Sequence, residues 1–259
     1  IFKFSPEKNY SGRDMSNYII NKLSNKDIMC LTTDTASSTK AYFKDEDYFS
    51  KKSKTGKNIA CGVRELGASA IANGLSLMGI RTISSTFLSF SNYMIPSIRM
   101  ASLMKLNNIY LFTHDSVLVG EDGPTHQPIE QIDMLRLIPG VSVFRPSDRN
   151  EMIGAYKKAF CSDYPCVIVA SKDILPICNY TDINKTLLGG YILKGNLNSK
   201  VCIIASGSEV ALALDISDSL EKHMVDSMVV SMPSLEEFSK LKKEEQEKID
   251  RKSTRLNSS

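Results

Sequence analysis

Long apolar runs are absent from these 259 residues: no stretch is long enough to cross a bilayer as a helix, and residues 1–6 lack a secretory pattern. No Cys-x-x-Cys pair occurs among the six scattered cysteines, which favours free thiols in a reducing compartment over disulfides or a zinc site. A surplus of one charge is absent too. Three of the 32 basic residues lie in residues 251–259, and the others equal the 29 acidic residues in number. Overall charge therefore gives no argument for nucleic-acid binding.

Strand-like and helix-like segments alternate along most of the chain. We expect strands at residues 27–33, 81–86, 108–113, 141–144 and 165–170, and helices at residues 12–23, 64–77, 92–105, 129–136 and 151–160. A second strand-helix-strand unit follows between residues 201 and 230. The repeated β-α pattern indicates an α/β fold with a doubly wound, mostly parallel sheet and helices on both faces.

The same pattern divides the chain into four parts. We expect a first domain at residues 1–178, a turn-rich linker at residues 179–198 and an incomplete second α/β domain at residues 199–250. The second domain is judged incomplete because a single β-α-β unit is too small to stand alone. Residues 251–259 carry cations without periodicity and are expected to be disordered or non-native. The chain is therefore expected to be a fragment of a longer protein.

Titratable side chains crowd residues 114–128, directly after the strand expected at residues 108–113. His114 and His126, two of the chain's three histidines, lie there beside the carboxylates of Asp122 and its neighbours. Ligands of open α/β sheets bind beyond the carboxyl ends of the strands, so this loop is the first candidate for a functional site. Ordinary surface histidines or a zinc site are the alternatives, although no zinc-binding spacing is present.

Two further segments carry residues of chemical interest. Glu65 opens the helix expected at residues 64–77, where a carboxylate either compensates the helix dipole or, partly buried, shares a proton with a ligand nitrogen. Phe87, Phe90 and Tyr93 recur every three residues after a strand, which suits either a core cluster or a pocket for a flat heterocycle. The residues alone leave both pairs of alternatives open.

Taken in order, these motifs resemble the pyrimidine-binding domain of transketolases, enzymes that depend on thiamine diphosphate. The resemblance extends over about residues 12–249 and implies reversible transfer of a two-carbon ketol unit from a ketose phosphate to an aldose phosphate in the pentose phosphate pathway. The matching runs include Gly62-Val63-Arg64-Glu65, Thr113-His114-Asp115-Ser116, Gly120-Glu121-Asp122-Gly123-Pro124-Thr125-His126-Gln127-Pro128, Arg145-Pro146-x-Asp148 and Gly207-Ser208-Glu209-Val210.

The resemblance implies roles for individual side chains. Glu65 would hydrogen-bond the N1′ atom of the cofactor's aminopyrimidine ring, and His114 and His126 would assist proton transfers. Lys172 stands where the family has a phosphate-binding arginine, so it keeps the charge but loses the bidentate fork. Cofactor binding is implied for Glu65, Phe87, Phe90, Tyr93 and His126, and substrate binding for Arg13, Ser38, His114, Asp122 and Lys172.

The diphosphate half of the family's site has no counterpart in this sequence. The Gly-Asp-Gly…Asn motif that binds the diphosphate and its Mg²⁺ or Ca²⁺ ion is absent, so no metal ligand is assigned to this chain. The resemblance implies sugar-phosphate substrates and a cytoplasmic homodimer, or a partner subunit that carries the N-terminal domain; plastid targeting stays open. We expect no nucleic-acid or membrane partner, and we expect the isolated chain to be inactive.

Three other functions fit parts of the pattern. Dihydroxyacetone synthase and deoxyxylulose-phosphate synthase share the cofactor, and the Thr113-His114-Asp115-Ser116 run favours transketolase over the latter. A catalytically silent assembly or regulatory subunit is the alternative from a different class. The presence of every implied acid–base residue argues against that alternative.

Overall fold

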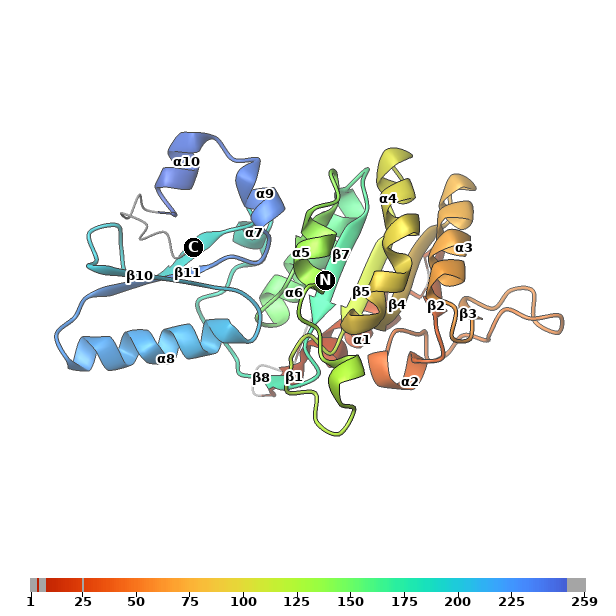
Figure 1. Cartoon of the computed structure of the whole chain (residues 1–259), viewed down its shortest axis with the longest axis horizontal. Helices are drawn as coiled ribbons and strands as arrows, with labels where there is room; N and C mark the ends of the chain where they lie inside the picture. The colour runs from red at the N-terminus through yellow and green to blue at the C-terminus, as the bar shows by residue number, and fades with distance from the viewer. Residues whose placement is uncertain (1–3, 5–7, 25, 251–259) are drawn as a thin grey trace.

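The computed structural model describes residue 4, residues 8–24 and residues 26–250, and its largest element is a six-stranded sheet (Figure 1). The strands are β2 (Ile28–Thr32), β3 (Asn58–Ala60), β4 (Arg81–Phe87), β5 (Ile109–Thr113), β6 (Ser142–Phe144) and β7 (Cys166–Ala170). Their order is β3-β2-β4-β5-β7-β6, and all neighbours run parallel. Strands β5 and β7 are buried along their whole length, as parallel strands covered on both faces should be.

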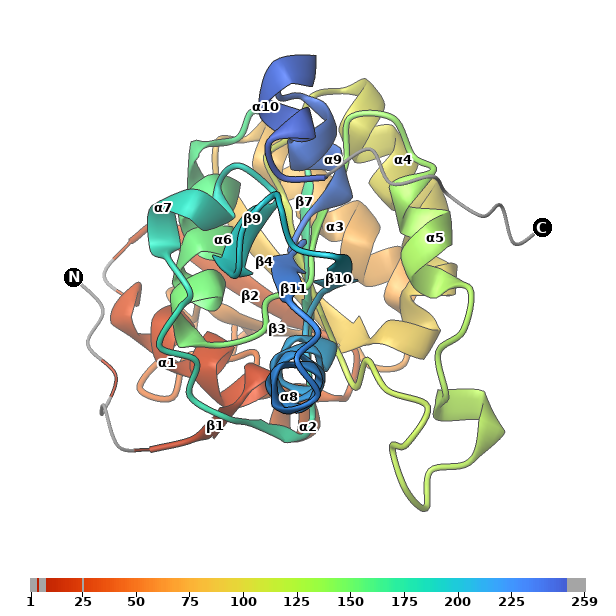
Figure 2. The ribbon, with the colours of Figure 1, turned by 90° about the vertical axis from the view of Figure 1, so that its left-hand side faces the viewer.

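Helices cover both faces of this sheet (Figure 2). On one face, α1 (Gly12–Lys22) and α6 (Arg149–Cys161) pack into one apolar cluster with the sheet. On the other face, α3 (Glu65–Leu77), α4 (Ile95–Leu103) and α5 (Gln131–Arg136) form a second cluster. The predicted α/β fold with a doubly wound parallel sheet is therefore confirmed.

Side-chain caps determine where two of these helices begin. The Ser11 hydroxyl accepts a hydrogen bond from the Asp14 backbone N–H at 3.2 Å, which caps α1. The Asp148 carboxylate accepts from the Glu151 backbone N–H at 3.0 Å, which caps α6. Such caps satisfy backbone donors that the first helical turn leaves without partners.

A smaller mixed sheet forms the second unit of the chain. Its elements are β9 (Tyr191–Lys194), β10 (Val201–Ala205), α8 (Glu209–Lys222), β11 (Ser227–Ser231), α9 (Leu235–Ser239) and α10 (Lys243–Glu247). Strand β11 lies in the middle, parallel to β10 and antiparallel to β9. The segment 179–198, expected as a linker, contains β9 and the short helix α7 (Ile183–Thr186). Four alternating residues are too short a pattern for β9 to stand out in the sequence.

Other short elements also differ from the sequence-based expectation. Strand β3 directly follows the polar, lysine-rich segment of residues 40–57 and was not expected. The helix expected from residue 92 is a 3₁₀ segment followed by α4. Pro96 lies in the first turn of α4, where its missing N–H is harmless. The remaining elements are β1 (Tyr10–Ser11), α2 (Ala36–Thr39), η1 (Leu88–Met94), η2 (Pro124–His126) and β8 (Ile174–Leu175).

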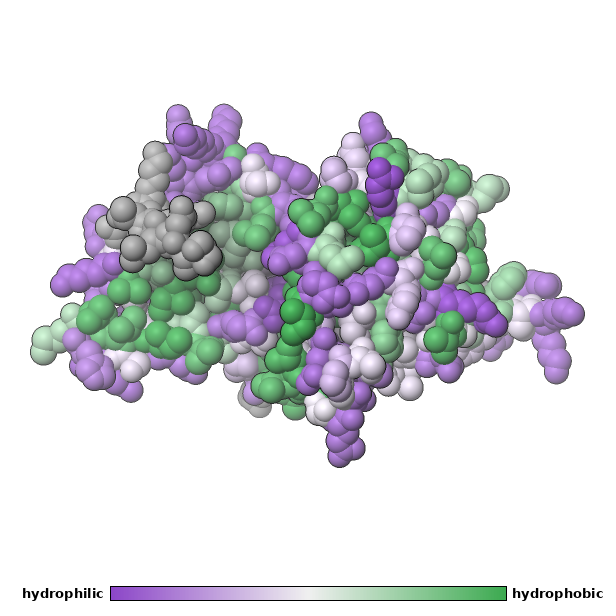
Figure 3. Space-filling model, in the orientation of Figure 1, coloured by the Kyte–Doolittle hydropathy of each residue, from purple (hydrophilic) through white to green (hydrophobic). Residues whose placement is uncertain are grey.

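An apolar surface lies on the second unit, over α8 and β10 (Figure 3). Ile204, Leu212 and Ile216 are 45%, 58% and 42% exposed. Contiguous exposed apolar side chains of this kind mark surfaces that contact other parts of a protein. No helix in the described part of the chain is long and apolar enough to span a membrane. Residues 251–259, expected to be disordered, lie outside the described residues.

Candidate functional site

All the residues assigned a role from the sequence lie near one edge of the six-stranded sheet. Phe87 ends β4, His114 follows β5 and Lys172 follows β7, while Ser38 lies in α2 after β2 and Glu65 begins α3 after β3. Because these strands run parallel, their carboxyl ends meet at the same edge. Figure 1 shows this edge at the bottom of the sheet, where the loop of residues 114–128 projects. Binding sites of open α/β sheets lie at such an edge.

Glu65 lies at the wall of an open pocket of about 570 Å³. Its side chain belongs to the first turn of α3, and the residue is only 7% exposed. The Thr86 hydroxyl, from strand β4, donates a long hydrogen bond of 3.4 Å to Glu65 Oε1. A mostly buried carboxylate against aromatic walls suits a flat ring that carries a nitrogen. The pocket is lined by Val63, Arg64, Glu65, Leu66, Gly67, Phe90 and Tyr93.

A chain of ring contacts joins this pocket to the two histidines. Phe87 lies 5.7 Å from Phe90 and 4.1 Å from His114, measured between ring centroids. His126 contacts both phenylalanines, at 5.7 Å from Phe87 and 4.9 Å from Phe90. Phe87 thus links the pocket-lining Phe90 to His114, whereas His126 contacts Phe90 directly; Phe90 and Tyr93 line the pocket itself. The three residues form one aromatic wall, and the two histidines adjoin it.

His114 is held in an unusual backbone conformation. Its φ angle is +63°, in the left-handed region that a residue other than glycine rarely adopts. Its ring Nδ1 lies 2.7 Å from the Thr113 hydroxyl, which leaves Nε2 as the ring nitrogen for a ligand. Burial, together with the positive charges of Arg13 and Lys172, lowers the pKa of His114 to about 4. The imidazole is therefore neutral at pH 7.

The low pKa of His114 predicts a pH dependence of stability. Between about pH 6.5 and pH 4 the unfolded chain protonates this histidine while the folded chain does not, so acid favours the unfolded state. The free energy of unfolding should fall with decreasing pH, with a contribution from His114 of up to about 1.4 kcal/mol per pH unit. Urea unfolding at pH 7 and pH 5 measures this. The His114→Gln variant should lose less stability than the wild type over this interval; an equal loss would contradict the assignment.

Basic side chains gather beside His114. Arg13 Nη1 donates to the backbone carbonyl of Ser38 at 2.8 Å, and its Nε atom is buried without a hydrogen-bond partner among the described residues. Lys172 Nζ donates to the carbonyl of Val119 at 2.8 Å and lies 3.6 Å from the Asp122 carboxylate. The resemblance implied substrate roles for Arg13, Ser38, Asp122 and Lys172; in the structure Arg13, Asp122 and Lys172 lie close to His114, and Ser38 contacts Arg13. Two cations at one end of a site suit an anionic group such as a phosphate.

The structure adds supporting residues to which the sequence assigned no role. The Thr86 and Thr113 hydroxyls contact Glu65 and His114, and both threonines lie at the ends of strands. Asp115 forms an ion pair with Arg145 at 3.0 Å, although the two lie 30 residues apart. The Arg-Pro motif was a signal for Arg145, but no local pattern indicated its partner. No group of three or more His, Cys, Asp or Glu residues in the described ranges is placed to hold a metal ion.

Two family profiles match this chain. The profile of the transketolase pyrimidine-binding domain matches residues 11–177, and that of the transketolase-like C-terminal domain matches residues 189–256. The transketolase of Halalkalibacterium halodurans is 43% identical over 227 residues, which cover 84% of this chain and 34% of the relative. The chain therefore spans about a third of the length of the curated relatives it matches.

Solved structures give the same assignment. The transketolase of Pichia stipitis in complex with sedoheptulose 7-phosphate is 32% identical, with a TM-score of 0.90, and the match covers 94% of this chain and 38% of that one. A split-gene transketolase described as an inactive β4 tetramer is 27% identical, with a TM-score of 0.70, and the match covers 88% of this chain and 73% of that one. The edge of the sheet that carries Glu65 and His114 thus belongs to a known kind of domain, and the chain is a member of the transketolase family.

Proposed function

We propose that this chain supplies the pyrimidine-binding half of a transketolase site, which moves a two-carbon ketol unit between sugar phosphates. The observation that carries the proposal is the buried Glu65 carboxylate in a pocket walled by Phe90 and Tyr93. This pocket continues through Phe87 to the two histidines. Family membership and the sugar phosphate bound by the Pichia stipitis relative support the same function.

The pocket residues fit the aminopyrimidine ring of thiamine diphosphate. Glu65 offers a carboxylate that can hold or share a proton at a ring nitrogen, and Phe90 and Tyr93 offer faces for stacking. Because Glu65 is only 7% exposed, little water reaches its carboxylate, and a hydrogen bond to a ring nitrogen is stronger there than in water. When bound, the cofactor supplies the carbon nucleophile for ketol transfer. We assign its pyrimidine end to this chain and its diphosphate and Mg²⁺ or Ca²⁺ ion to another domain.

The histidines and Asp122 then face the sugar. In the tautomer whose Nδ1–H donates to the Thr113 hydroxyl, the neutral His114 can accept a proton from a sugar hydroxyl at Nε2. His126 contacts both Phe87 and Phe90, so it is placed to act near the junction of cofactor and substrate. Asp122 can accept hydrogen bonds from sugar hydroxyls. These groups bind the sugar and move its protons.

Replacing Lys172 by arginine should lower the Michaelis constant for a phosphorylated donor by a few-fold. In the chain, Lys172 contacts the Val119 carbonyl and the Asp122 carboxylate, and an ammonium lacks the fork that binds phosphate in two places. Steady-state kinetics of this chain combined with a polypeptide that carries the diphosphate half of the site measures this, with a donor sugar and with the same sugar lacking its phosphate. The constant should fall only for the phosphorylated sugar. An unchanged constant would mean that the phosphate binds elsewhere.

The isolated chain should bind thiamine diphosphate weakly, with little dependence on Mg²⁺. Its described residues provide no cluster of metal ligands, and the pocket offers a place for the pyrimidine ring only. Isothermal titration with thiamine diphosphate, with and without Mg²⁺, measures this. Tight binding that requires Mg²⁺ would contradict the division of the site between two domains. The inactive split-gene relative supports that division.

We propose that the chain functions with a second polypeptide or domain that carries the diphosphate half, or as part of a homodimer in the complete enzyme. The exposed apolar side chains over α8 and β10 and at the Glu65 pocket supply surface for such contacts; Val63, which lines that pocket, is 77% exposed. All six cysteines are free, which supports a reducing location such as the cytoplasm.

A further inference from the structure

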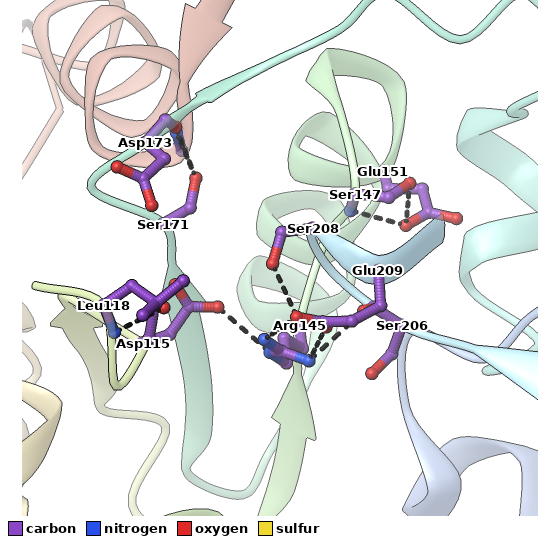
Figure 4. Close-up of polar contacts among 12 residues, drawn as sticks. Asp115, Leu118, Arg145, Ser147, Glu151, Ser171, Asp173, Ser206, Ser208 and Glu209 are labelled. Atoms are coloured by element: carbon purple, nitrogen blue, oxygen red, sulfur yellow. Dashed lines mark hydrogen bonds and ion pairs between the residues drawn. The ribbon is translucent and has the colours of Figure 1, made fainter. Parts of the chain in front are cut away.

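Arg145 joins the two units of the chain at the site edge (Figure 4). It follows β6, and its side chain is 14% exposed. Its Nε atom donates to Asp115 Oδ2 at 3.0 Å in the first unit. On the other side its guanidinium forms an ion pair with the Glu209 carboxylate, with Nη2 donating to Oε1 at 3.2 Å, and it donates to the Ser206 carbonyl at 3.2 Å. One side chain thus bridges the loop after β5 and the start of α8.

The Asp115 carboxylate depends on Arg145 for the balance of its negative charge. The Asp115 side chain is 2% exposed, and its Oδ1 atom has no hydrogen-bond partner among the described residues. Burial raises the pKa of Asp115, and the charge of Arg145 opposes that rise. A buried carboxylate without its cation either takes up a proton or moves toward water. Arg145 therefore fixes the position of Asp115 in the loop after β5.

Asp115 is the residue that follows His114. His114 holds a left-handed conformation that is strained for any residue other than glycine, so its surroundings must maintain it. The Thr113 hydroxyl contacts the His114 ring on one side, and the Asp115–Arg145 ion pair fixes the backbone on the other. Loss of that ion pair would free the backbone to relax and would carry the imidazole away from Phe87.

The second unit, in turn, holds Arg145 closely. The Arg145 backbone N–H donates to the Pro233 carbonyl at 2.8 Å, and its carbonyl accepts from the Gly207 N–H at 2.9 Å. A Cβ atom at Gly207 would lie 2.9 Å from Arg145 Cγ, and the φ angle of Gly207 is +59°. Glycine is therefore required at this position for the turn before α8 to approach the arginine.

We propose that Arg145 is a positioning residue through which the second unit, by way of Asp115, holds His114 in place for catalysis. The proposal rests on the role assigned to His114 under the proposed function. Under this proposal the second unit contributes to the reaction by positioning His114. Among the described residues, no side chain of that unit lines the Glu65 pocket. Glu209 and Gly207 serve as the anchors of this connection.

The test follows the His114 ring directly in the full chain, without cofactor or substrate. The chain holds only three histidines, so ¹⁵N-labelled histidine gives three sets of ring signals by nuclear magnetic resonance, and His114→Gln assigns one of them. The variants are Arg145→Gln and the milder Glu209→Gln. The control is Glu236→Gln, because Glu236 also joins the two units, through Arg136 at 3.4 Å and the Val143 N–H at 3.1 Å.

Arg145→Gln should shift the His114 ring signals and move the titration midpoint of His114 up by about one pH unit or more, toward its ordinary value. Glu209→Gln should shift them in the same direction by less, and Glu236→Gln should leave them in place. The charged or titratable groups that face His114 (Arg13, Asp122, His126 and Lys172) are the same in every variant.

Unchanged His114 signals in Arg145→Gln would overturn the proposal, and so would an equal shift in Glu236→Gln, since that would indicate general loosening between the units. If Arg145→Gln fails to fold, Glu209→Gln decides by the same criterion, because the Glu209 side chain is 51% exposed and its loss is tolerable. The signals are read without ketol transfer, so failure of this inference is distinguishable from failure of the proposed function.

Discussion

Glu65→Gln is expected to lower the turnover number of ketol transfer by about 10²–10⁴-fold, the usual contribution of a positioned acid–base group. The assay combines this chain with the part of the Halalkalibacterium halodurans transketolase that the chain does not match, referred to below as the complementing polypeptide. Glutamine keeps the size of the side chain and can still hydrogen-bond, but it cannot hold or release a proton. The effect should therefore fall on turnover, with the Michaelis constants for the sugars nearly unchanged.

The surroundings of Glu65 explain why no neighbour can replace it. The pocket is lined by aromatic and aliphatic side chains and by Arg64, whose Nη1 atom donates to the Cys61 carbonyl at 2.9 Å. The Thr86 hydroxyl supports the Glu65 carboxylate but does not exchange a proton at neutral pH. Glu65 is thus the one carboxylate among the lining residues of this pocket in the described chain.

The matched control is Glu244→Gln, which changes an exposed glutamate in α10. It should leave turnover as in the wild type. Retention of more than about a third of wild-type turnover by Glu65→Gln would contradict the catalytic assignment. It would leave Glu65 as a carboxylate that only compensates the dipole of α3.

Glu151→Ala is expected to lower the free energy of unfolding by about 4 kcal/mol, the largest stability effect of any single change considered for this chain. The Glu151 side chain is fully buried. One carboxylate oxygen accepts from the Ser147 N–H and hydroxyl, both at 2.8 Å. The other accepts from the Tyr191 hydroxyl at 2.7 Å and the Ser231 hydroxyl at 2.5 Å.

Removal of this carboxylate leaves four donors without their acceptor, and two of those donors belong to the second unit. A buried donor that loses its charged acceptor lowers the free energy of unfolding by more than a typical hydrogen bond contributes, because water cannot reach the donor and replace the acceptor. Glu151 therefore stabilises the junction of the two units as well as α6.

Urea unfolding at pH 7, followed by circular dichroism, measures the loss. Glu221→Ala is the control, since Glu221 forms an ion pair with Lys194 at 2.9 Å but is 48% exposed; such surface pairs contribute about 0–1 kcal/mol. If Glu151→Ala lost no more stability than Glu221→Ala, the junction would not depend on this carboxylate.

The main elements of the fold were predictable from the sequence because each one buries a regular apolar pattern. Strand β5 and helix α1 were expected within one residue of their observed bounds. Strands β3 and β9 lie in polar or turn-rich segments that obscure their short patterns, whereas the equally short β6 is buried at every position. They depend on their neighbours in the sheet for their conformation.

The candidate site was predictable in part, for a different reason. The residues themselves left the functions of Glu65 and of the Phe87–Tyr93 stripe open, and the resemblance to transketolases favoured the cofactor-binding alternative. The structure brings these groups together through contacts between distant segments, such as Phe87 with His114. The Asp115–Arg145–Glu209 connection joins residues 30 and 64 positions apart, and no local pattern specifies such a pairing.

The central claim is that this chain supplies the pyrimidine half of a transketolase site. Co-expression with the complementing polypeptide, followed by an assay of ketol transfer from a ketose phosphate to an aldose phosphate, tests it most directly. We predict transfer that requires both polypeptides, thiamine diphosphate and a divalent metal ion, and that disappears with Glu65→Gln. If both polypeptides fold and associate but show no transfer above that of the complementing polypeptide alone, the chain is a silent subunit and the claim is wrong.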